Sequence, residues 1–183
     1  MASDVAKKLE PVGRSPVPLA ECALARAIRT IGDGWTLLIL REALCGVERF
    51  DAMCEDLAIP RAVLADRLAR LVEAGILEQK SYREAGQRTR NAYILSERGR
   101  ALIPALVALR GWAEDHLPGG RSRLRLRDID GQEVSAHLIR PDGKRVDDLS
   151  GIAAVADAPK QPLPRRAAAP KPRYSSPKAG RER

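Results

Sequence analysis

Residues 60–77, PRAVLADRLARLVEAGIL, have the spacing of one amphipathic helix that leads into an extended segment. Pro60 is favoured at the first position of a helix, and Gly75 is expected to end it. The predicted buried stripe consists of Leu64, Leu68, Leu71 and Val72. The opposite face holds Ala62, Asp66, Arg70 and Glu73, with Arg61 and Arg67 at its flanks. Taken alone, this pattern fits a DNA-reading helix and a core helix with a solvated back equally well.

Shorter helices are predicted before this stretch. The first carries apolar residues at helical spacing and ends at Gly32-Asp33-Gly34; these residues are Leu24, Ala27, Ile28 and Ile31. Residues 35–44 are apolar nearly all round, which predicts a central helix that neighbours cover on most sides. A third, short helix is predicted from Phe50 to Leu57, with Met53 and Cys54 on its inner face.

A basic hairpin is predicted directly after residues 60–75. Two β-prone arms, 76–82 and 91–95, flank a polar turn that contains Gly86. The turn region carries three arginines within eight residues: Arg83, Arg88 and Arg90. A hairpin can place such cations on phosphates beside a helix in the major groove, and this favours the DNA-reading interpretation of residues 60–75.

The last predicted helix is long and covers residues 97–117, with Ser96 as its N-cap and a bend at Pro104. Its apolar stripe consists of Leu102, Leu106, Leu109 and Trp112. The short first helix is too small to cover this stripe, so the sequence predicts a homodimer in which a second copy covers it.

The two ends of the chain differ in composition from its middle. We expect an N-terminal arm at 1–18, a DNA-binding domain at 19–118, a small β-meander at 121–156 punctuated by Asp130-Gly131 and Pro141-Asp142-Gly143, and a disordered Pro-rich tail at 157–183. The formal net charge is +8, of which the tail supplies eight positive and two negative residues. The tail fits either a solvated spacer or a nonspecific DNA tether.

Composition and cysteine spacing indicate in which cell compartment the protein works and which classes of function are excluded. The N-terminus does not resemble an export signal, and no segment is apolar enough to span a membrane. Cys22, Cys45 and Cys54 form no CxxC pair, which argues against a disulfide framework or a zinc site and favours a cytoplasmic protein, nucleoid-associated when bound to DNA. The sequence has two histidines, no Gly-rich phosphate loop and no paired metal ligands, so we expect no cofactor and no enzyme activity.

Several motifs in this order resemble the HxlR-type family of winged helix-turn-helix regulators, relatives of the MarR group. The resemblance rests on Cys22 near a helix start and on IGDGWTLLILRE, RF, LADRLARL and LSERGRAL, and it extends from Cys22 to about Leu117. It implies a mainly α fold with a β-hairpin wing (α+β), flanking dimerisation helices and a homodimer on near-palindromic promoter DNA. Family members commonly have a basic residue where Gly34 stands and a Pro-Pro wing tip, whereas this wing, REAGQRTRNAY, is longer.

The resemblance also implies roles for individual residues. The groove-facing residues would be Arg61, Ala62, Val63, Asp66, Arg67 and Arg70, and the wing contacts Arg83, Arg88 and Arg90. The dimer interface would use Leu24 and Ile28 of the first helix together with Leu102, Leu106, Leu109 and Trp112 of the last. The alternative function is a winged-helix module for nonspecific nucleic-acid or protein binding.

The cysteines divide into two groups. Cys45 and Cys54 lie on apolar helix faces and are expected to be small core residues. Cys22 lies in the first turn of a helix, whose positive end favours a thiolate, and some relatives sense oxidants or electrophiles at this position. Glu21 opposes this effect. A small-molecule or electrophile effector is therefore a hypothesis, next to a structural role for Cys22.

Overall fold

The computed structural model describes residues 15, 17–83, 88–150, 152 and 154. Its elements are α2 (Ala23–Ile31), α3 (Gly34–Leu44), α4 (Phe50–Leu57), α5 (Arg61–Glu73), β1 (Leu77–Tyr82), β2 (Arg90–Leu95), α6 (Glu97–Arg100) and α7 (Ile103–His116). One compact unit runs from Val17 to Ile152. The predicted arm lies outside the described residues apart from positions 15, 17 and 18, and the predicted tail lies wholly outside them.

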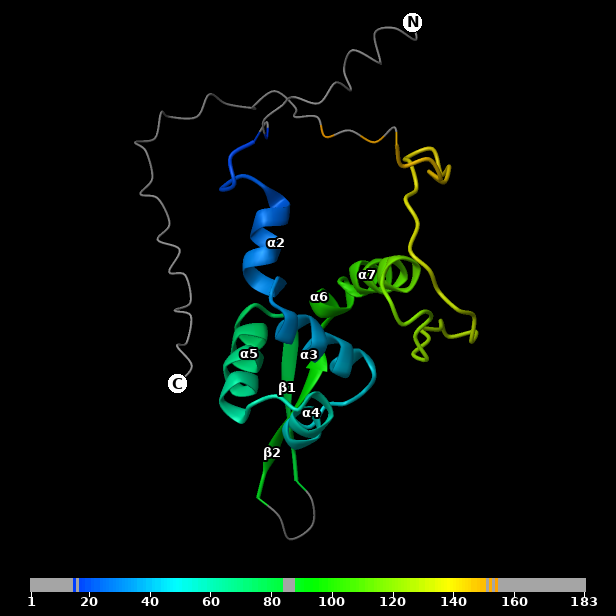
Figure 1. Ribbon diagram of the computed structural model, residues 1–183. Coiled ribbons are helices and arrows are strands. Elements are labelled where there is room, and N and C mark those ends of the chain that lie inside the picture. Colours follow the sequence, from blue (N-terminus) through cyan, green and yellow to red (C-terminus); the bar gives the residue numbers. More distant parts are fainter. Residues whose placement is uncertain (1–14, 16, 84–87, 151, 153, 155–183) are drawn as a thin grey trace, which may run out of the picture. The chain divides into compact units, whose positions relative to one another are not determined.

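A winged-helix core forms where α3, α4 and α5 pack with the antiparallel β1–β2 hairpin (Figure 1). The side chains at its centre are fully buried: Ile39, Leu40, Met53, Leu64, Leu68, Leu71 and Leu77. The predicted stripe of α5 is confirmed, with Val72 half-buried at its edge. Burial of this stripe fixes which face of α5 points to solvent.

The helix ends follow the capping signals in the sequence. Asp33 caps α3 by accepting a hydrogen bond from the Thr36 backbone N–H at 3.1 Å. Pro60 is the N-cap of α5, one residue before the position predicted for it. After α5, Gly75 has a φ of +67°, which a glycine adopts without strain. This left-handed residue turns the chain directly into β1.

The hairpin has a fixed register from Leu77 opposite Leu95 to Tyr82 opposite Arg90. Leu77 and Leu95 on its inner face are buried in the core, and Ala92 is buried beside its bridge to Arg49. The backbone N–H of Tyr93 also donates to the Glu48 carbonyl at 2.8 Å, which ties the α3–α4 connection to β2. Both strands match the predicted arms, and the predicted turn with Gly86 lies at residues 84–87, outside the described residues.

The predicted long helix is divided into α6 and α7. Ser96 caps α6, its Oγ accepting from the Gly99 N–H at 3.0 Å and donating to the Gly75 carbonyl at 2.7 Å. Pro104 has no N–H, and its ring would collide with the Arg100 carbonyl in a continuous helix. The chain therefore breaks at Ala101 and Leu102 and starts α7 afresh, a larger change than the predicted bend.

Residues 121–150, which we call the extension, do not form the predicted meander. The turns at Asp130-Gly131 and Asp142-Gly143 occur as expected, but the strand pairing beside each is limited to an isolated bridge, Arg127 to Glu133 and Ile139 to Arg145. A sheet needs a shared apolar face, and Ile129 is fully exposed while Leu138 and Ile139 are mostly exposed. The predicted strands therefore lack the burial that would hold them together.

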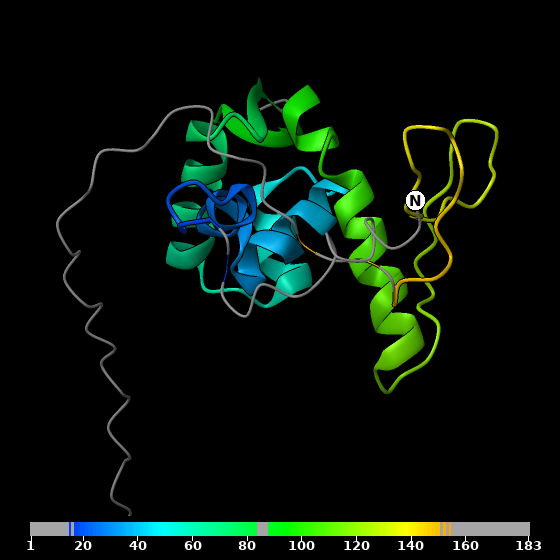
Figure 2. The ribbon, with the colours of Figure 1, turned by 90° about the horizontal axis from the view of Figure 1, so that it is seen from above.

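Contacts with α7 hold the extension in place instead. Glu114 accepts a hydrogen bond from the Ser122 backbone N–H at 3.0 Å and pairs with Arg125 at 3.1 Å, while Arg110 donates to the Leu124 carbonyl at 3.0 Å. Figure 2 shows α7 between the helical core and the loops of the extension. Within the described part of the chain, no helix is long and apolar enough to cross a membrane.

Candidate nucleic-acid interface

The exposed face of α5 carries most of the predicted groove-facing residues. Arg61, Ala62, Asp66 and Arg70 are all exposed, and Val63 is half-buried at the margin of the face. Arg70 Nε lies 3.1 Å from both carboxylate oxygens of Asp66, an i,i+4 ion pair along the helix. The burial of Leu64, Leu68 and Leu71 leaves this polar face as the part of α5 available to a partner.

Arg67 differs from its neighbours on α5. Its Nε lies 3.3 Å from Asp33 at the start of α3, and its side chain is only 26% exposed. Partial burial alone would raise the pKa of Asp33, but the hydrogen bonds from Thr36 and the Arg67 charge outweigh this effect and lower it. Arg67 therefore braces α5 against α3, whereas the sequence placed it in the groove-facing set.

Asp51, at the start of α4, joins α5 to the β1–β2 hairpin. Arg61 Nη1 lies 2.8 Å from Asp51 Oδ1, and Arg90 Nη1 lies 2.9 Å from Asp51 Oδ2. The Arg61 guanidinium also stacks on the Phe50 ring, 4.8 Å from its centroid. The Arg61 hydrogen bond is the main reason that the pKa of Asp51 is lowered, with further help from the charges of Arg61 and Arg90.

A cleft of about 370 Å³ opens around Asp51, Arg61 and Arg90, with Tyr82 and Asn91 on its hairpin side. We call these three charged residues the Asp51 cluster. Sequence analysis did not single out Asp51, because its partners lie 10 and 39 residues away and no helical or strand spacing links them. The sequence signal that could have drawn attention to Asp51 is its place as an acidic residue in the first turn of α4.

The other wing arginines, Arg83 and Arg88, are exposed on either side of residues 84–87. Arg49 joins them on the hairpin side, with its guanidinium 5.0 Å from the centroid of the Tyr82 ring. Sequence analysis did not identify Arg49. Its position follows from an isolated bridge to Ala92, which brings the α3–α4 connection alongside β2.

The predicted dimer residues form two groups. Leu24 and Ile28 on α2 and Leu109 and Trp112 on α7 are each more than half exposed, whereas Leu102 and Leu106 pack against the core. No residue of α2 is buried, although Ile31 at its end touches the core. Two of the six predicted dimer residues thus pack against the core, and four are exposed on α2 and α7.

The three cysteines occupy different environments. Cys22 is the half-buried N-cap of α2 and makes no side-chain capping hydrogen bond. Cys54 is half-buried against the core, in agreement with its predicted role. The core prediction for Cys45 is wrong, because α3 ends there and the left-handed Gly46, with a φ of +81°, turns the chain away, leaving Cys45 exposed.

Known proteins of similar sequence and fold indicate the family of this chain. The model of the HxlR-like helix-turn-helix family matches residues 30–120. A solved structure, PA1607, proposed to be a transcription factor, is 35% identical and has a TM-score of 0.64, covering 75% of this chain and 96% of that one. The chain belongs to the HxlR-like helix-turn-helix family. The family and fold implied by the sequence motifs are thereby confirmed.

Other relatives carry the same kind of name. An uncharacterized HTH-type transcriptional regulator of Mycobacterium tuberculosis, Rv3095, is 43% identical over 96 residues, which are 52% of this chain and 60% of that protein. PA1374 of Pseudomonas aeruginosa, also proposed to be a transcription factor, is 31% identical with a TM-score of 0.51 over 76% of this chain and 94% of its own. These relatives carry names of transcriptional regulators and not of enzymes, in agreement with the class of function that the sequence predicts.

Proposed function

We propose that this HxlR-like protein is a sequence-specific regulator that binds inverted-repeat promoter DNA as a homodimer. The observation that supports it most strongly is the Asp51 cluster, in which Arg61 of α5 and Arg90 of β2 meet on one carboxylate. The exposed face of α5 and the hairpin therefore meet at one charged cluster of two arginines and one carboxylate. The surface that they form together has the parts that a winged helix needs to fill a major groove and touch the adjacent phosphates.

Within this proposal, each exposed arginine has one of two roles. Arg61 and Arg70, both exposed on α5, would reach guanine edges, where a bidentate contact discriminates between bases. Arg83, Arg88 and Arg90 on the wing would contact phosphates, which contribute affinity without sequence preference. The remaining exposed or marginal positions, Ala62, Val63 and Asp66, would shape the fit of α5 to the groove.

The homodimer would form through α2 and α7. Leu24, Ile28, Leu109 and Trp112 supply the exposed apolar surface, and Leu102 and Leu106 support it from beneath. Two-fold symmetry would place the recognition helices on half-sites about one duplex turn, or a small multiple, apart.

Selection of bound genomic fragments by the purified protein, followed by footprinting, tests the proposal. One protected inverted repeat, bound at least about a thousandfold more tightly than random duplex, is the expected result. Arg61→Ala and Arg70→Ala should each weaken specific binding by about 1–3 kcal/mol and random binding by less. Arg88→Ala and Arg90→Ala should weaken both alike and reduce the salt slope by about 0.9 per lost contact.

The alternative is a winged-helix module that binds proteins or nucleic acids without sequence preference. It predicts equal affinity for selected and random duplexes, and equal losses for all four arginine variants. That result would overturn the proposal of base readout.

Modulation through Cys22 is the finer part of the proposal. Cys22 caps the helix that carries Leu24 and Ile28, so a bulky or charged adduct on its Sγ would disturb the proposed dimer. Treatment with a quinone, which alkylates the thiol by addition, should lower operator affinity of the wild type and leave Cys22→Ser unchanged. Unchanged affinity of a protein shown by mass spectrometry to be modified at Cys22 would return this cysteine to a structural role.

A further inference from the structure

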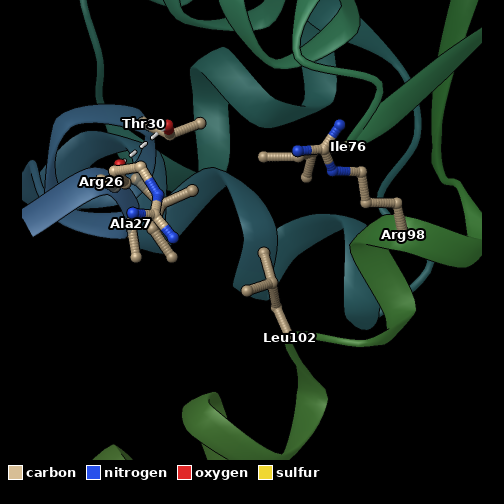
Figure 3. A pocket seen from close by; sticks show the side chains of 7 residues that line it. Arg26, Ala27, Thr30, Ile76, Arg98 and Leu102 are labelled. Atoms are coloured by element: carbon tan, nitrogen blue, oxygen red, sulfur yellow. Dashed lines mark hydrogen bonds between the residues drawn. The ribbon is translucent and has the colours of Figure 1, made fainter. Parts of the chain in front are cut away.

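A pocket of about 400 Å³ lies between α2, the residue that leads into β1, and α6 (Figure 3). We call it the α2–α6 pocket. It lies at the base of the hairpin, at the opposite end from residues 84–87, and so it is separate from the proposed DNA surface. Arg26 of α2 and Arg98 of α6 supply its charge, while Ile31, Ile76 and Leu102 supply apolar surface.

The two arginines face the same space from opposite walls. Figure 3 shows the Arg98 side chain reaching from α6 back toward α2, with Arg26 on the α2 side. Arg26 donates to the backbone carbonyl of Glu21 at 3.1 Å. Throughout the described part of the chain, no carboxylate lies within ion-pair distance of either Arg26 or Arg98.

This contrasts with three arginines of the proposed DNA surface. Arg61, Arg70 and Arg90 each have a carboxylate within 3.1 Å. Two guanidiniums that line one pocket without a counter-charge favour an anion between them, and a planar carboxylate matches guanidinium geometry.

The apolar part of the lining restricts the anion further. Ile76 is only 4% exposed, and Ile31 and Leu102 are half-buried against the core. A bare inorganic anion would leave this surface uncovered, and a neutral apolar molecule would desolvate the guanidiniums without pairing them. The volume falls within the range of sites for small organic ligands.

We propose that the α2–α6 pocket binds a small organic carboxylate with a compact apolar body, and that binding sets the position of α2. The second half rests on the proposed function. No residue of α2 is buried, so few contacts hold this helix to the core. A ligand bound by both Arg26 and Arg98 would therefore contribute a large share of the contacts that fix α2. Leu24 and Ile28, on another face of α2, would move with it and alter the spacing of the two recognition helices.

Calorimetric titration of the full chain with 1-naphthoate, without DNA, tests the site itself. We expect saturable binding tighter than about 1 mM, at least about tenfold tighter than binding of the neutral 1-naphthalenemethanol. Arg26→Gln and Arg98→Gln should each weaken naphthoate binding by about tenfold or more. The matched controls Arg29→Gln on α2 and Arg100→Gln on α6, which remove the same charge outside the pocket, should leave it unchanged.

Three results would overturn the site: no saturable binding, equal binding of the neutral compound, or full binding by Arg26→Gln and Arg98→Gln. Circular dichroism and urea unfolding establish that each variant is folded. A second titration measures affinity for selected DNA with and without naphthoate. If naphthoate does not change the affinity for selected DNA, the proposed effect on α2 is overturned. If the protein shows no sequence-specific DNA binding, the proposed function is overturned, while the calorimetric result for the pocket still stands.

Discussion

Asp51 shows how one acidic residue can govern a basic surface. In the free protein its carboxylate holds Arg61 Nη1 and Arg90 Nη1 at 2.8 and 2.9 Å, so neither guanidinium can pair with DNA there unless this carboxylate is displaced. A nonspecific phosphate contact must compete with the Asp51 carboxylate for these arginines. A full set of base contacts at a correct site would offset the loss of the hydrogen bonds to Asp51. Under the proposed function, Asp51 would therefore favour correct sites over random DNA.

Asp51→Asn should raise the affinity for random duplex several-fold, to about tenfold at low salt, because it removes a negative charge and releases two cations for phosphates. The salt slope should steepen by about 0.9 for each new contact, and the preference for the selected site should fall. Fluorescence anisotropy across a salt series measures all three quantities. Glu55→Gln, which removes a charge from the same helix but releases neither Arg61 nor Arg90, is the control, and an equal effect of both changes would contradict this role.

At the scale of elements, the fit between α6 and the connection from α5 to β1 depends on Gly99. A Cβ at this position would lie 2.2 Å from the Ile76 carbonyl oxygen and 3.0 Å from Leu95 Cδ2, so α6 approaches the chain too closely for any side chain. The Ser96 hydroxyl donates to the Gly75 and Ile76 carbonyls at the same junction. The junction is therefore closed by a backbone contact rather than by interlocking side chains.

Gly99→Ala should lower the free energy of unfolding by about 1–3 kcal/mol, because backbone must shift to admit the methyl group. Gly34→Ala is the matched control, since a Cβ on Gly34 meets nothing within 4 Å. Alanine in the first turn of α3 should be neutral or raise the stability by up to about 1 kcal/mol. Urea denaturation compares the two, and equal effects would show that the α6 contact is unimportant.

The packing of α3 on α4 places an acid in the interior. Glu42 is only 3% exposed, and burial raises its pKa; Asp56 adds to this rise, while Arg41 opposes it. A carboxyl whose pKa is higher in the folded state stabilises the fold most when protonated. Its contribution is complete below the ordinary glutamate pKa of 4.5 and is lost as the pH rises through the raised value.

Glu42→Gln should therefore stabilise the protein near neutral pH and have little effect in acid, because glutamine mimics the protonated form at every pH. Urea unfolding at about pH 4 and about pH 7 measures the difference. The exposed Glu55→Gln should show no such dependence on pH. A variant less stable than the wild type at both pH values would mean that the ionised Glu42, paired with Arg41, stabilises the fold.

The helices of the core and the hairpin follow from the sequence because their signals are local. Apolar spacing in residues 64–72 and caps such as Asp33 act within one or two turns of chain. The extension has the same turn signals but too few buried apolar residues to make a sheet, and this lack of burial cannot be seen in the turn dipeptides. The sequence predicts a bend at Pro104, but the helix breaks before α7. Whether a proline bends or breaks a helix depends on whether bending can relieve the collision of its ring with the preceding turn.

The site was less predictable than the fold. The exposed residues of α5 follow from the helical period once the buried stripe is known. Arg67 lies next to that stripe, so its side chain could point to solvent or toward α3. Its orientation toward α3 depends on Asp33, which is 34 positions earlier in the chain. Asp51 and Arg49 reach the hairpin through tertiary contacts, which a single sequence does not encode as a pattern.

At the scale of the whole molecule, we expect association through α2 and α7 to be required for tight operator binding. Leu109→Glu places a charge in the proposed interface and should weaken the dimer at least about a hundredfold, because the carboxylate would be buried without a partner. Light scattering at micromolar concentration should show a dimer for the wild type and a monomer for the variant. Leu138→Glu, at an exposed apolar position of the extension, is the control, and a wild-type monomer that binds the operator tightly would contradict the proposal.

The absence of buried residues on α2 has a consequence for solvent exchange of its backbone. Amide hydrogens of α5, held by a buried stripe, should exchange with deuterium only on opening of the core and at a rate independent of protein concentration. Amides of α2 should exchange rapidly in dilute solution and slow down as concentration rises, because the partner supplies the burial that the single chain lacks. Two helices of one domain would then report two different equilibria, folding and association, in the same deuterium-uptake experiment.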